Sequence, residues 1–321
     1  MPVAGRVTLG IPTLNRAALA VRAIRSALAQ TYADVEVLVS DDGSTDDTVA
    51  QVRAIADQRL RLYEQPQRLG LVANFDFCLR HATGEYFLLL GDDDLLLPQA
   101  IEQLCAPFLA PDGSSVGVVW CPCRIAAAGG EQFWTTEAGP ASEPPAQLLT
   151  QLWAGNRGPR LSSILLRAQD AIRAGGYLQK YGDLCDIGNW GLAALAYDRA
   201  ICVPQPLVQY TNHPGSTTSQ SAIERWQESA RLVHHDLVGA AEARGDRAGA
   251  RQLRGAWSNF LSGITLTILI QTIGQPGWVR NALRQAVRTP QAFFTPYMLR
   301  RLLKDGRKVL TVRRATGAQR G

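Results

Sequence analysis

The sequence lacks the glycine-rich signatures of two large nucleotide-binding classes. It contains no G-x-G-x-x-G segment, which excludes a dinucleotide-binding dehydrogenase. Gly5 and Gly10 have the spacing of a phosphate-binding loop, but Ile11-Pro12 follows where Lys and Ser or Thr are required. The first residues run directly into a strand-like segment without a long apolar stretch, so we expect no secretory signal.

Long hydrophobic runs and paired cysteines are also missing. The longest apolar stretch, Phe260–Gly274, is shorter than the ~20 residues of a membrane-spanning helix and contains polar side chains, so we expect a buried helix. Six cysteines are scattered without a C-x-x-C pair. The one close spacing, Cys121-Pro122-Cys123, has no matching Cys or His pair after it. We therefore expect buried thiols in a reducing compartment rather than a zinc site.

The first half of the chain alternates between short apolar runs and segments with helical spacing. Strand-like runs occupy residues 7–12, 35–40, 60–64 and 86–90, and helical segments occupy 15–30, 46–56 and 71–81. This order predicts an α/β fold with a mostly parallel central sheet flanked by helices. We interpret Gly129–Pro145 as a loop, and we expect a helix at Gly188–Ala196 and long helices from Ser221 onward. The predicted organisation is an α/β domain at residues 1–215 and a basic, helical C-terminal region at 216–321.

Charge is unevenly distributed along the chain, whose formal net charge is +5. Residues 276–321 contain eleven Lys and Arg residues and a single acid, Asp305, so the rest of the chain is net acidic. Aromatic and aliphatic residues interleave with these cations, a composition that suits an amphipathic helix on an anionic membrane surface. A helical cap with a solvated basic face is the alternative. Nucleic acid is not an expected partner, because no binding motif accompanies the charge.

Three consecutive carboxylates, Asp92, Asp93 and Asp94, follow the strand-like run Tyr86–Leu90. Like charges this close repel one another, and a bound cation relieves the repulsion. Oxygen ligands are those that Mg²⁺ and Mn²⁺ prefer, usually together with substrate phosphates. In open α/β sheets ligands bind beyond the carboxyl ends of the strands, where these acids are expected. A helix N-cap is the structural alternative, but one Asp would suffice for it.

Two further segments follow predicted strands. Ser40–Thr48, SDDGSTDDT, combines a turn and a helix cap with Asp41 and Asp42 at the strand tip. Those two carboxylates can accept hydrogen bonds from a ribose hydroxyl or a base N–H. The segment Gly10–Arg16, GIPTLNR, is by itself typical of a strand, a turn and the start of a helix.

In this order, IPTLNR, SDDGSTDDT and GEYFLLLGDDDLLLP resemble the sequential motifs of the family-2 glycosyltransferases with the GT-A fold. The later segments GGYLQKYGDLCDIGNW and PLVQYTNHPGSTTS resemble that family's acceptor-side segment and its His-containing loop. The resemblance covers residues 5–218. It implies an inverting glycosyltransferase that moves a sugar from a nucleoside diphosphate sugar, with UDP as the default nucleotide, to a hydroxyl of a glycan or lipid-linked saccharide. It also implies Mn²⁺ or Mg²⁺ as the cofactor.

The resemblance also implies roles by position. The nucleotide pocket would be formed by Pro12, Thr13, Asn15, Asp41, Asp42 and Asp92. The metal would be bound by Asp93, Asp94 and His213, with Asp93 as the principal ligand. Many family members carry an acid where this chain has Gly91, which leaves the division of work between Asp92 and Asp94 open.

Asp186 corresponds to the general base of the family, with Asp183 as the second candidate. The residue before Asp186 is Cys185, where the family usually has Glu. Either Asp could instead be a helix N-cap.

Two other functions stay open. A nucleotide-sugar-binding protein without catalytic activity would explain the departures at Gly91 and Cys185. A nucleotidyltransferase is less favoured, because the segment after the first strand lacks a glycine-rich phosphate loop with Arg or Lys. For the transferase we expect a cytoplasmic location, peripheral on the inner face of the membrane if the basic tail binds lipid.

Overall fold

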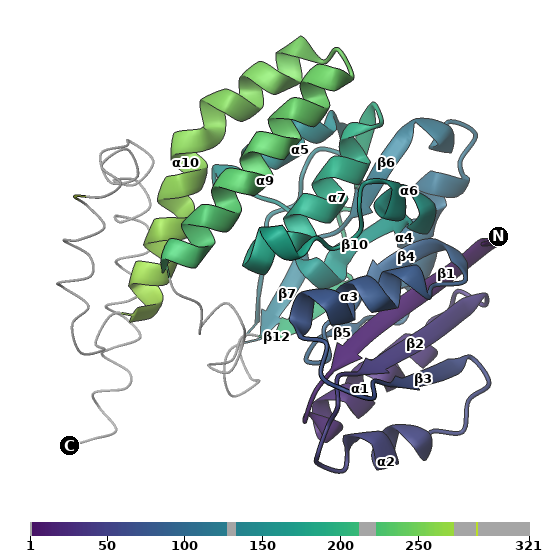
Figure 1. Ribbon diagram of the computed structural model, residues 1–321. Helices are drawn as coiled ribbons and strands as arrows, with labels where there is room; N and C mark the ends of the chain where they lie inside the picture. Colours follow the sequence, from purple (N-terminus) through teal and green to yellow (C-terminus); the bar gives the residue numbers. More distant parts are fainter. Residues whose placement is uncertain (1, 127–132, 212–222, 273–286, 288–321) are drawn as a thin grey trace.

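The computed structural model describes residues 2–126, 133–211, 223–272 and 287 (Figure 1). The main sheet contains β1 (Val3–Thr13), β2 (Val35–Asp41), β3 (Leu60–Glu64), β4 (Gly84–Leu89), β6 (Val116–Trp120), β9 (Ser142–Glu143), β10 (Ile164–Arg167) and β11 (Arg199–Cys202). Its strand order is β3-β2-β1-β4-β10-β6-β11-β9. The first four strands of this order are parallel, whereas β10 is antiparallel to both of its neighbours. The predicted α/β architecture with a mostly parallel sheet is therefore confirmed.

A second sheet of four strands lies beside the first. It contains β5 (Leu95–Leu96), β7 (Cys123–Ala126), β8 (Phe133–Thr135) and β12 (Val208–Thr211), in the order β5-β12-β7-β8. The interpretation of residues 129–145 as a loop is wrong where β8 and β9 form. Trp134 and Thr135 favour strands and pair with β7, while Glu143 of β9 forms an ion pair with Arg157 at 2.6 Å.

The helices agree in order with the predicted segments. They are α1 (Ala17–Leu28), α2 (Thr48–Arg53), α3 (Leu71–Arg80), α4 (Ala100–Leu109), α5 (Pro145–Trp153), α6 (Ala168–Arg173), α7 (Cys185–Leu195), α9 (Ile223–Ala243) and α10 (Arg247–Thr272). Short 3-10 helices occur at η1 (Gly113–Ser115), η2 (Leu161–Ser163) and η3 (Gln179–Leu184). Helix α7 begins at Cys185, earlier than expected, which places Asp186 in its first turn.

The strands have apolar side chains on both faces, because each face of the sheet carries its own hydrophobic core. In β1, Val7, Leu9 and Ile11 pack into the core that also contains residues of α1 and α4. The opposite face of β1 presents Gly10, where an added Cβ would lie 2.9 Å from the Cβ of Cys78 and from the Phe87 ring. Glycine at this position therefore lets α3 approach the sheet closely.

The helices α9 and α10 lie side by side and pack over the layer that contains α5 and α7 (Figure 1). Val233 and Leu237 of α9 share one buried cluster with Trp190 of α7. Asp236 of α9 accepts a hydrogen bond from the hydroxyl of Tyr181 at 2.7 Å, which fixes η3 just before α7. The helical character expected after Ser221 is thus seen in α9 and α10, while the division into 1–215 and 216–321 stays a prediction.

In the described part of the chain, no helix combines the length and the hydropathy that a membrane crossing requires. The apolar stretch that begins at Phe260 instead belongs to α10, with Phe260 and Leu261 buried. The basic tail at 276–321 lies, except for Val287, outside the described residues, and so does His213. All six cysteines are buried and free, as expected.

Candidate functional site

The three N-terminal motifs meet at one edge of the main sheet. Thr13 at the end of β1 is in register with Asp41 at the end of β2, and the N–H of Asp42 donates to the carbonyl of Thr13 at 2.9 Å. On the other side of β1, the N–H of Leu90 donates to the carbonyl of Gly10 at 2.8 Å. The carboxyl ends of β1, β2 and β4 therefore lie next to one another, where an α/β sheet binds ligands.

Asp92 lies at the centre of this edge. Its side chain is 8% exposed and accepts hydrogen bonds from the hydroxyl of Thr13 at 2.9 Å and from a guanidinium nitrogen of Arg16 at 3.0 Å. Burial raises the pKa of Asp92, the charge of Arg16 lowers it, and the charge of Asp93 raises it. The site therefore holds a buried acid whose ionised form depends on a nearby cation.

Asp93 and Asp94 point to different partners. Asp93 accepts a hydrogen bond from the same Arg16 nitrogen at 3.2 Å. Asp94 accepts one from the hydroxyl of Ser162 at 2.5 Å and one from the N–H of Thr211 at 3.0 Å. Burial and then the charge of Asp93 raise the pKa of Asp94 to about 7, against the effect of these hydrogen bonds. The contacts of Asp94 favour a positioning role, and its role as a metal ligand stays a prediction.

A divalent ion fits this site only in part. In the described ranges, no group of three or more His, Cys, Asp or Glu residues has the arrangement of a metal site. Asp92 and Asp93 do stand together at the strand ends, and a cation already bridges them in the form of Arg16. Mg²⁺-type ions are commonly held by one or two carboxylates plus substrate phosphates. The residues fit an ion that arrives with a diphosphate, and they do not form a three-acid cage.

The loop between β2 and α2 is held in place by the residues expected in the nucleotide pocket. Asn15 has a φ of 53° and accepts the N–H of Thr45 at 2.7 Å, while its own N–H donates to the hydroxyl of Ser44 at 2.8 Å. Asp41 accepts the N–H of Ser44 at 2.9 Å. The loops after β1 and β2 therefore form one hydrogen-bonded unit.

Asp42 is directed toward a different loop. It accepts the N–H groups of Leu69 at 2.6 Å and Gly70 at 3.1 Å, just before α3, and Arg68 lies 3.8 Å from it. Pro12 is buried within β1. The structure thus brings together Pro12, Thr13, Asn15, Asp41, Asp42 and Asp92 at one sheet edge, and their roles toward a nucleotide stay predictions.

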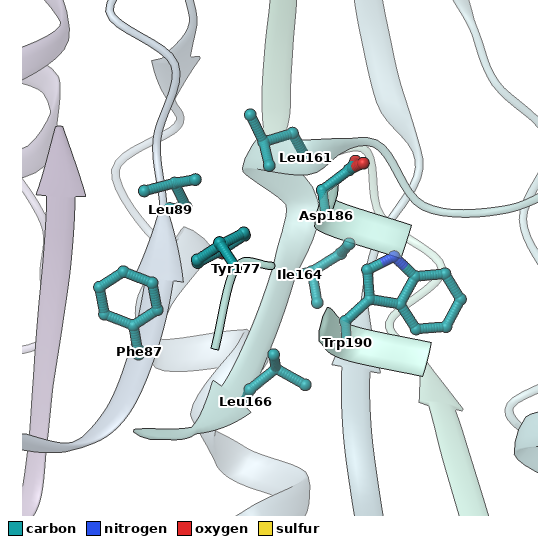
Figure 2. A pocket seen from close by; sticks show the side chains of 8 residues that line it. All are labelled: Phe87, Leu89, Leu161, Ile164, Leu166, Tyr177, Asp186 and Trp190. Carbon is teal, nitrogen blue, oxygen red and sulfur yellow. The ribbon is translucent and has the colours of Figure 1, made fainter. Parts of the chain in front are cut away.

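Asp186 lies at a small pocket formed over β4 and β10 (Figure 2). The pocket is lined by Phe87, Leu89, Leu161, Ile164, Leu166, Tyr177, Asp186 and Trp190. The pocket has a volume of about 10 Å³, which leaves room for about one water molecule. Loss of solvation raises the pKa of Asp186 to about 6, although backbone N–H groups and the charge of Arg160 oppose that rise.

Asp183, the second candidate base, has a different environment. Its side chain is 4% exposed, and its Oδ2 lies 3.7 Å from the Nε of Arg225 in α9. That oxygen has no hydrogen-bond partner in the described part of the chain. Asp183 therefore faces the helical pair, whereas Asp186 faces the pocket.

Residues around η2 connect the carboxylates at the strand ends with the pocket of Asp186. Leu161 lines the pocket of Asp186, and the next residue, Ser162, donates to Asp94. The guanidinium of Arg160 lies over the ring of Tyr210, 5.7 Å from its centroid. Burial raises the pKa of Tyr210 to about 12, and this ring also lies in the field of Asp93, Asp94 and Asp186.

No motif of the sequence pointed to Arg160 or Ser162, whereas Tyr210 stands in the segment PLVQYTNHPGSTTS, where no role was expected for it. Arg160 directly precedes η2, Ser162 lies within η2, and Tyr210 belongs to the short strand β12. Arg16 stood in a recognised motif, but its contacts with the acids depend on how α1 leaves β1.

Comparison with known proteins shows which family the N-terminal part of the chain matches. Residues 8–145 match the family model described as Glycosyl transferase family 2. This range contains the ends of β1, β2 and β4 and ends before Asp186. An uncharacterized protein of Mycobacterium tuberculosis is 28% identical over 233 residues, or 67% of this chain and 70% of the relative.

Two further proteins are informative. The GalNAc(5)-diNAcBac-PP-undecaprenol beta-1,3-glucosyltransferase of Campylobacter jejuni is 36% identical over 102 residues, 31% of this chain. The match spans only 33% of that enzyme's length. The crystal structure of S. aureus TarS 1–349 in complex with UDP-GlcNAc superposes with a TM-score of 0.63 at 16% identity, covering 89% of this chain and 78% of that TarS fragment. Residues 8–145 therefore match the family-2 glycosyltransferases, and the fold of the chain resembles that of the GT-A glycosyltransferase TarS.

Proposed function

We propose that the protein is an inverting glycosyltransferase. It would transfer a sugar from a nucleoside diphosphate sugar, by default a UDP-sugar, to a hydroxyl of a glycan or lipid-linked saccharide. Asp186 would act as the general base, and a divalent ion, Mn²⁺ or Mg²⁺, would assist departure of the diphosphate.

One observation carries this proposal. Two consecutive residues of η2 contact both the pocket of Asp186 and the acid motif, which consists of Asp92, Asp93 and Asp94. Leu161 lines the pocket, and Ser162 donates a hydrogen bond to Asp94. The strand ends suited to a donor and the carboxyl group suited to an acceptor are therefore both in contact with η2. Transfer between two substrates requires this proximity.

The donor side is supported by the loops after β1 and β2. Asp41 and Asp42 lie at the tip of β2, next to Thr13, and the polar groups there can bind a ribose and a base. Asp93 would hold the divalent ion together with the donor diphosphate, and Asp92 would support it through Thr13. When bound, the ion neutralises the negative charge of the leaving diphosphate. Additional ligation by Asp94 or His213 stays a prediction.

The acceptor side is supported by the environment of Asp186. A hydroxyl is a weak nucleophile near neutral pH, and a carboxylate within hydrogen-bond reach can take its proton. The raised pKa of Asp186, about 6, makes its carboxylate a stronger base than that of an ordinary Asp. Direct attack on the anomeric carbon by the activated hydroxyl would invert its configuration, with the diphosphate as the leaving group. Asp183 is less suited, because its inward oxygen lies toward Arg225.

The acceptor class is the least constrained part of the proposal. The C. jejuni relative is named for an undecaprenol-linked saccharide, and the basic tail at 276–321 suits an anionic surface. Both are consistent with a lipid-linked acceptor at the inner face of a membrane. Recovery of the full chain on anionic vesicles, with no loss on truncation near Pro276, would contradict the membrane role of the tail.

The proposal is tested by nucleotide binding and turnover. The melting temperature is measured with UDP, TDP and GDP, with and without Mn²⁺, for the native chain and for Asp93→Ala. We expect one nucleotide to raise the melting temperature in a Mn²⁺-dependent manner. At a hundredfold excess over its dissociation constant, the nucleotide should increase the free energy of unfolding by about 2.7 kcal/mol. The shift should be lost in Asp93→Ala, and its persistence there would contradict the metal site.

A second measurement separates the enzyme from a binding protein. Many transferases slowly transfer sugar to water, so release of the nucleoside diphosphate from the sugar donor is measured without an acceptor. Release that depends on Asp186 supports the transferase. Donor binding without any release, in the presence of candidate acceptors too, would favour a nucleotide-sugar-binding protein.

A further inference from the structure

Arg16 places a positive charge on the acid motif. It lies between the end of β1 and the start of α1, and its guanidinium turns back toward the end of β4. The same nitrogen donates to the Oδ1 of Asp92 at 3.0 Å and to the Oδ2 of Asp93 at 3.2 Å. One cation therefore bridges two carboxylates of the motif.

This bridge neutralises charge that the surroundings solvate poorly. The side chains of Asp92 and Asp93 are only 8% and 18% exposed, and that of Arg16 is 31% exposed. Two adjacent carboxylates with little solvent around them repel each other, and a nearby cation relieves this repulsion. A guanidinium keeps its charge throughout the physiological pH range, so the protein supplies this cation itself.

The bridge also competes with a divalent ion. An ion on Asp93 would stand close to the guanidinium, and two positive charges at one carboxylate repel each other. A diphosphate changes this balance, because its oxygens complete the shell of the ion and also match a guanidinium in bidentate geometry. Ion and guanidinium can then both be satisfied at the same time.

We propose that Arg16 is an internal counter-ion that occupies the acid motif until the donor arrives. The divalent ion then enters together with the nucleoside diphosphate, and Arg16 moves from the carboxylates to the phosphate oxygens. This inference rests on the proposed function, since it concerns the donor site of that same reaction. It makes Arg16 a positioning residue that suppresses metal binding in the absence of nucleotide.

The test measures Mn²⁺ binding directly, from the electron paramagnetic resonance signal of free Mn²⁺, without nucleotide and with UDP. The native chain is compared with Arg16→Gln and with Arg22→Gln, a control that removes an exposed Arg from α1. Without nucleotide we expect Arg16→Gln to bind Mn²⁺ about tenfold more tightly, as when the guanidinium leaves the carboxylates free for about a tenth of the time. Arg22→Gln should match the native chain.

A second expectation concerns UDP. The ratio of Mn²⁺ affinities with and without UDP should be smaller in Arg16→Gln than in the native chain, because one source of the coupling is gone. Equal Mn²⁺ affinity of the two proteins without nucleotide would overturn the inference. If Arg16→Gln does not fold, Arg16→Lys replaces it, since a compact ammonium bridges two carboxylates less well and should give a smaller gain. A native-like affinity for Arg16→Lys would then overturn the inference.

Failure of this inference is distinguishable from failure of the proposed function. Asp93→Ala is measured in the same assay with UDP. If Asp93→Ala retains native Mn²⁺ uptake, the metal site itself is wrong, whatever Arg16 does. If Asp93→Ala loses uptake while Arg16→Gln is unchanged, only the counter-ion role fails.

Discussion

The hydroxyl of Ser162 donates to Asp94 at 2.5 Å and at the same time accepts the N–H of Gly91 at 2.9 Å. This one side chain therefore connects η2 to the backbone that carries the acid motif. Ser162 and Asp94 are both buried, so water does not replace these contacts. The connection makes the geometry of the acid motif depend on a residue far away in the sequence.

Substitution of Ser162 by Ala should weaken both the fold and donor binding. The change leaves a buried carboxyl oxygen and the Gly91 N–H without this partner, which costs about 1–3 kcal/mol of unfolding free energy. Urea unfolding checks the stability, and Ser114→Ala, at an exposed position in η1, is the control. Native stability of Ser162→Ala would mean that Ser162 does not hold the motif.

Asp186→Asn should be inactive and, above neutral pH, more stable than the native protein. Loss of a general base lowers the transfer rate by about 10²–10⁴-fold. The folded pKa of Asp186, about 6, is higher than that of an unfolded Asp, so burial favours the protonated form. The corresponding stability is fully present below the unfolded pKa and is lost as the pH rises through 6.

At pH 8 the buried carboxylate therefore costs roughly 1–3 kcal/mol, which Asn avoids. Melting temperatures at pH 4 and pH 8 check this, and the advantage of Asn should shrink toward pH 4. Asp183→Asn is measured alongside. If Asp183→Asn loses transfer and Asp186→Asn retains it, the two roles must be exchanged.

The pH dependence of transfer should report the same group. Activity is expected to fall as the pH drops through about 6, where Asp186 becomes protonated. Four described residues, Arg160, Tyr177, Cys185 and Tyr210, interact electrostatically with Asp186. The pKa values of the last three are raised, so they stay neutral around neutral pH and only Arg160 contributes charge.

Arg160→Gln should therefore move the acidic limb of kcat/KM to higher pH, by up to about one unit. The control is Arg251→Gln, at an exposed position of α10. A structural role of Arg160 would lower activity without moving the limb. High salt should reduce the difference between the two variants, because Arg160 is exposed and its field is screened.

Gly91 directly precedes the three carboxylates Asp92, Asp93 and Asp94. A Cβ added there would lie 3.0 Å from the Oδ1 of Asp93 and 3.2 Å from the Oδ2 of Asp94. Gly91→Asp should be less stable than its neutral counterpart Gly91→Asn by about 1–4 kcal/mol without metal, because like charges repel. Mn²⁺ should narrow that gap in melting temperature. Equal stability of the two variants without Mn²⁺ would show that the neighbouring carboxyl groups do not carry the expected charge.

Local pattern was sufficient for the elements of the N-terminal half. Apolar runs at Val35 and Tyr86, separated by helical spacing, predicted strands and helices that the structure confirms, because a strand buried on both faces must be apolar throughout. The acids after those runs were expected at the strand ends, and they lie there. The prediction of a loop at residues 129–145 was wrong, because β8 and β9 form through pairing with β7 and β11. Such pairing partners cannot be recognised from the local sequence.

By itself the sequence determined the α/β order, the position of the three motifs at the carboxyl ends of the strands and the candidate carboxylates. Only the tertiary structure decided which carboxylate faces which partner. Arg16 donates hydrogen bonds to Asp92 and Asp93, and Ser162 and Thr211 donate to Asp94. Asp186 instead lines the pocket beside η2. The physical reason is range. Alternation and helical spacing act over a few residues, whereas the charge and solvation of a carboxyl group are set by atoms that folding brings from distant parts of the chain.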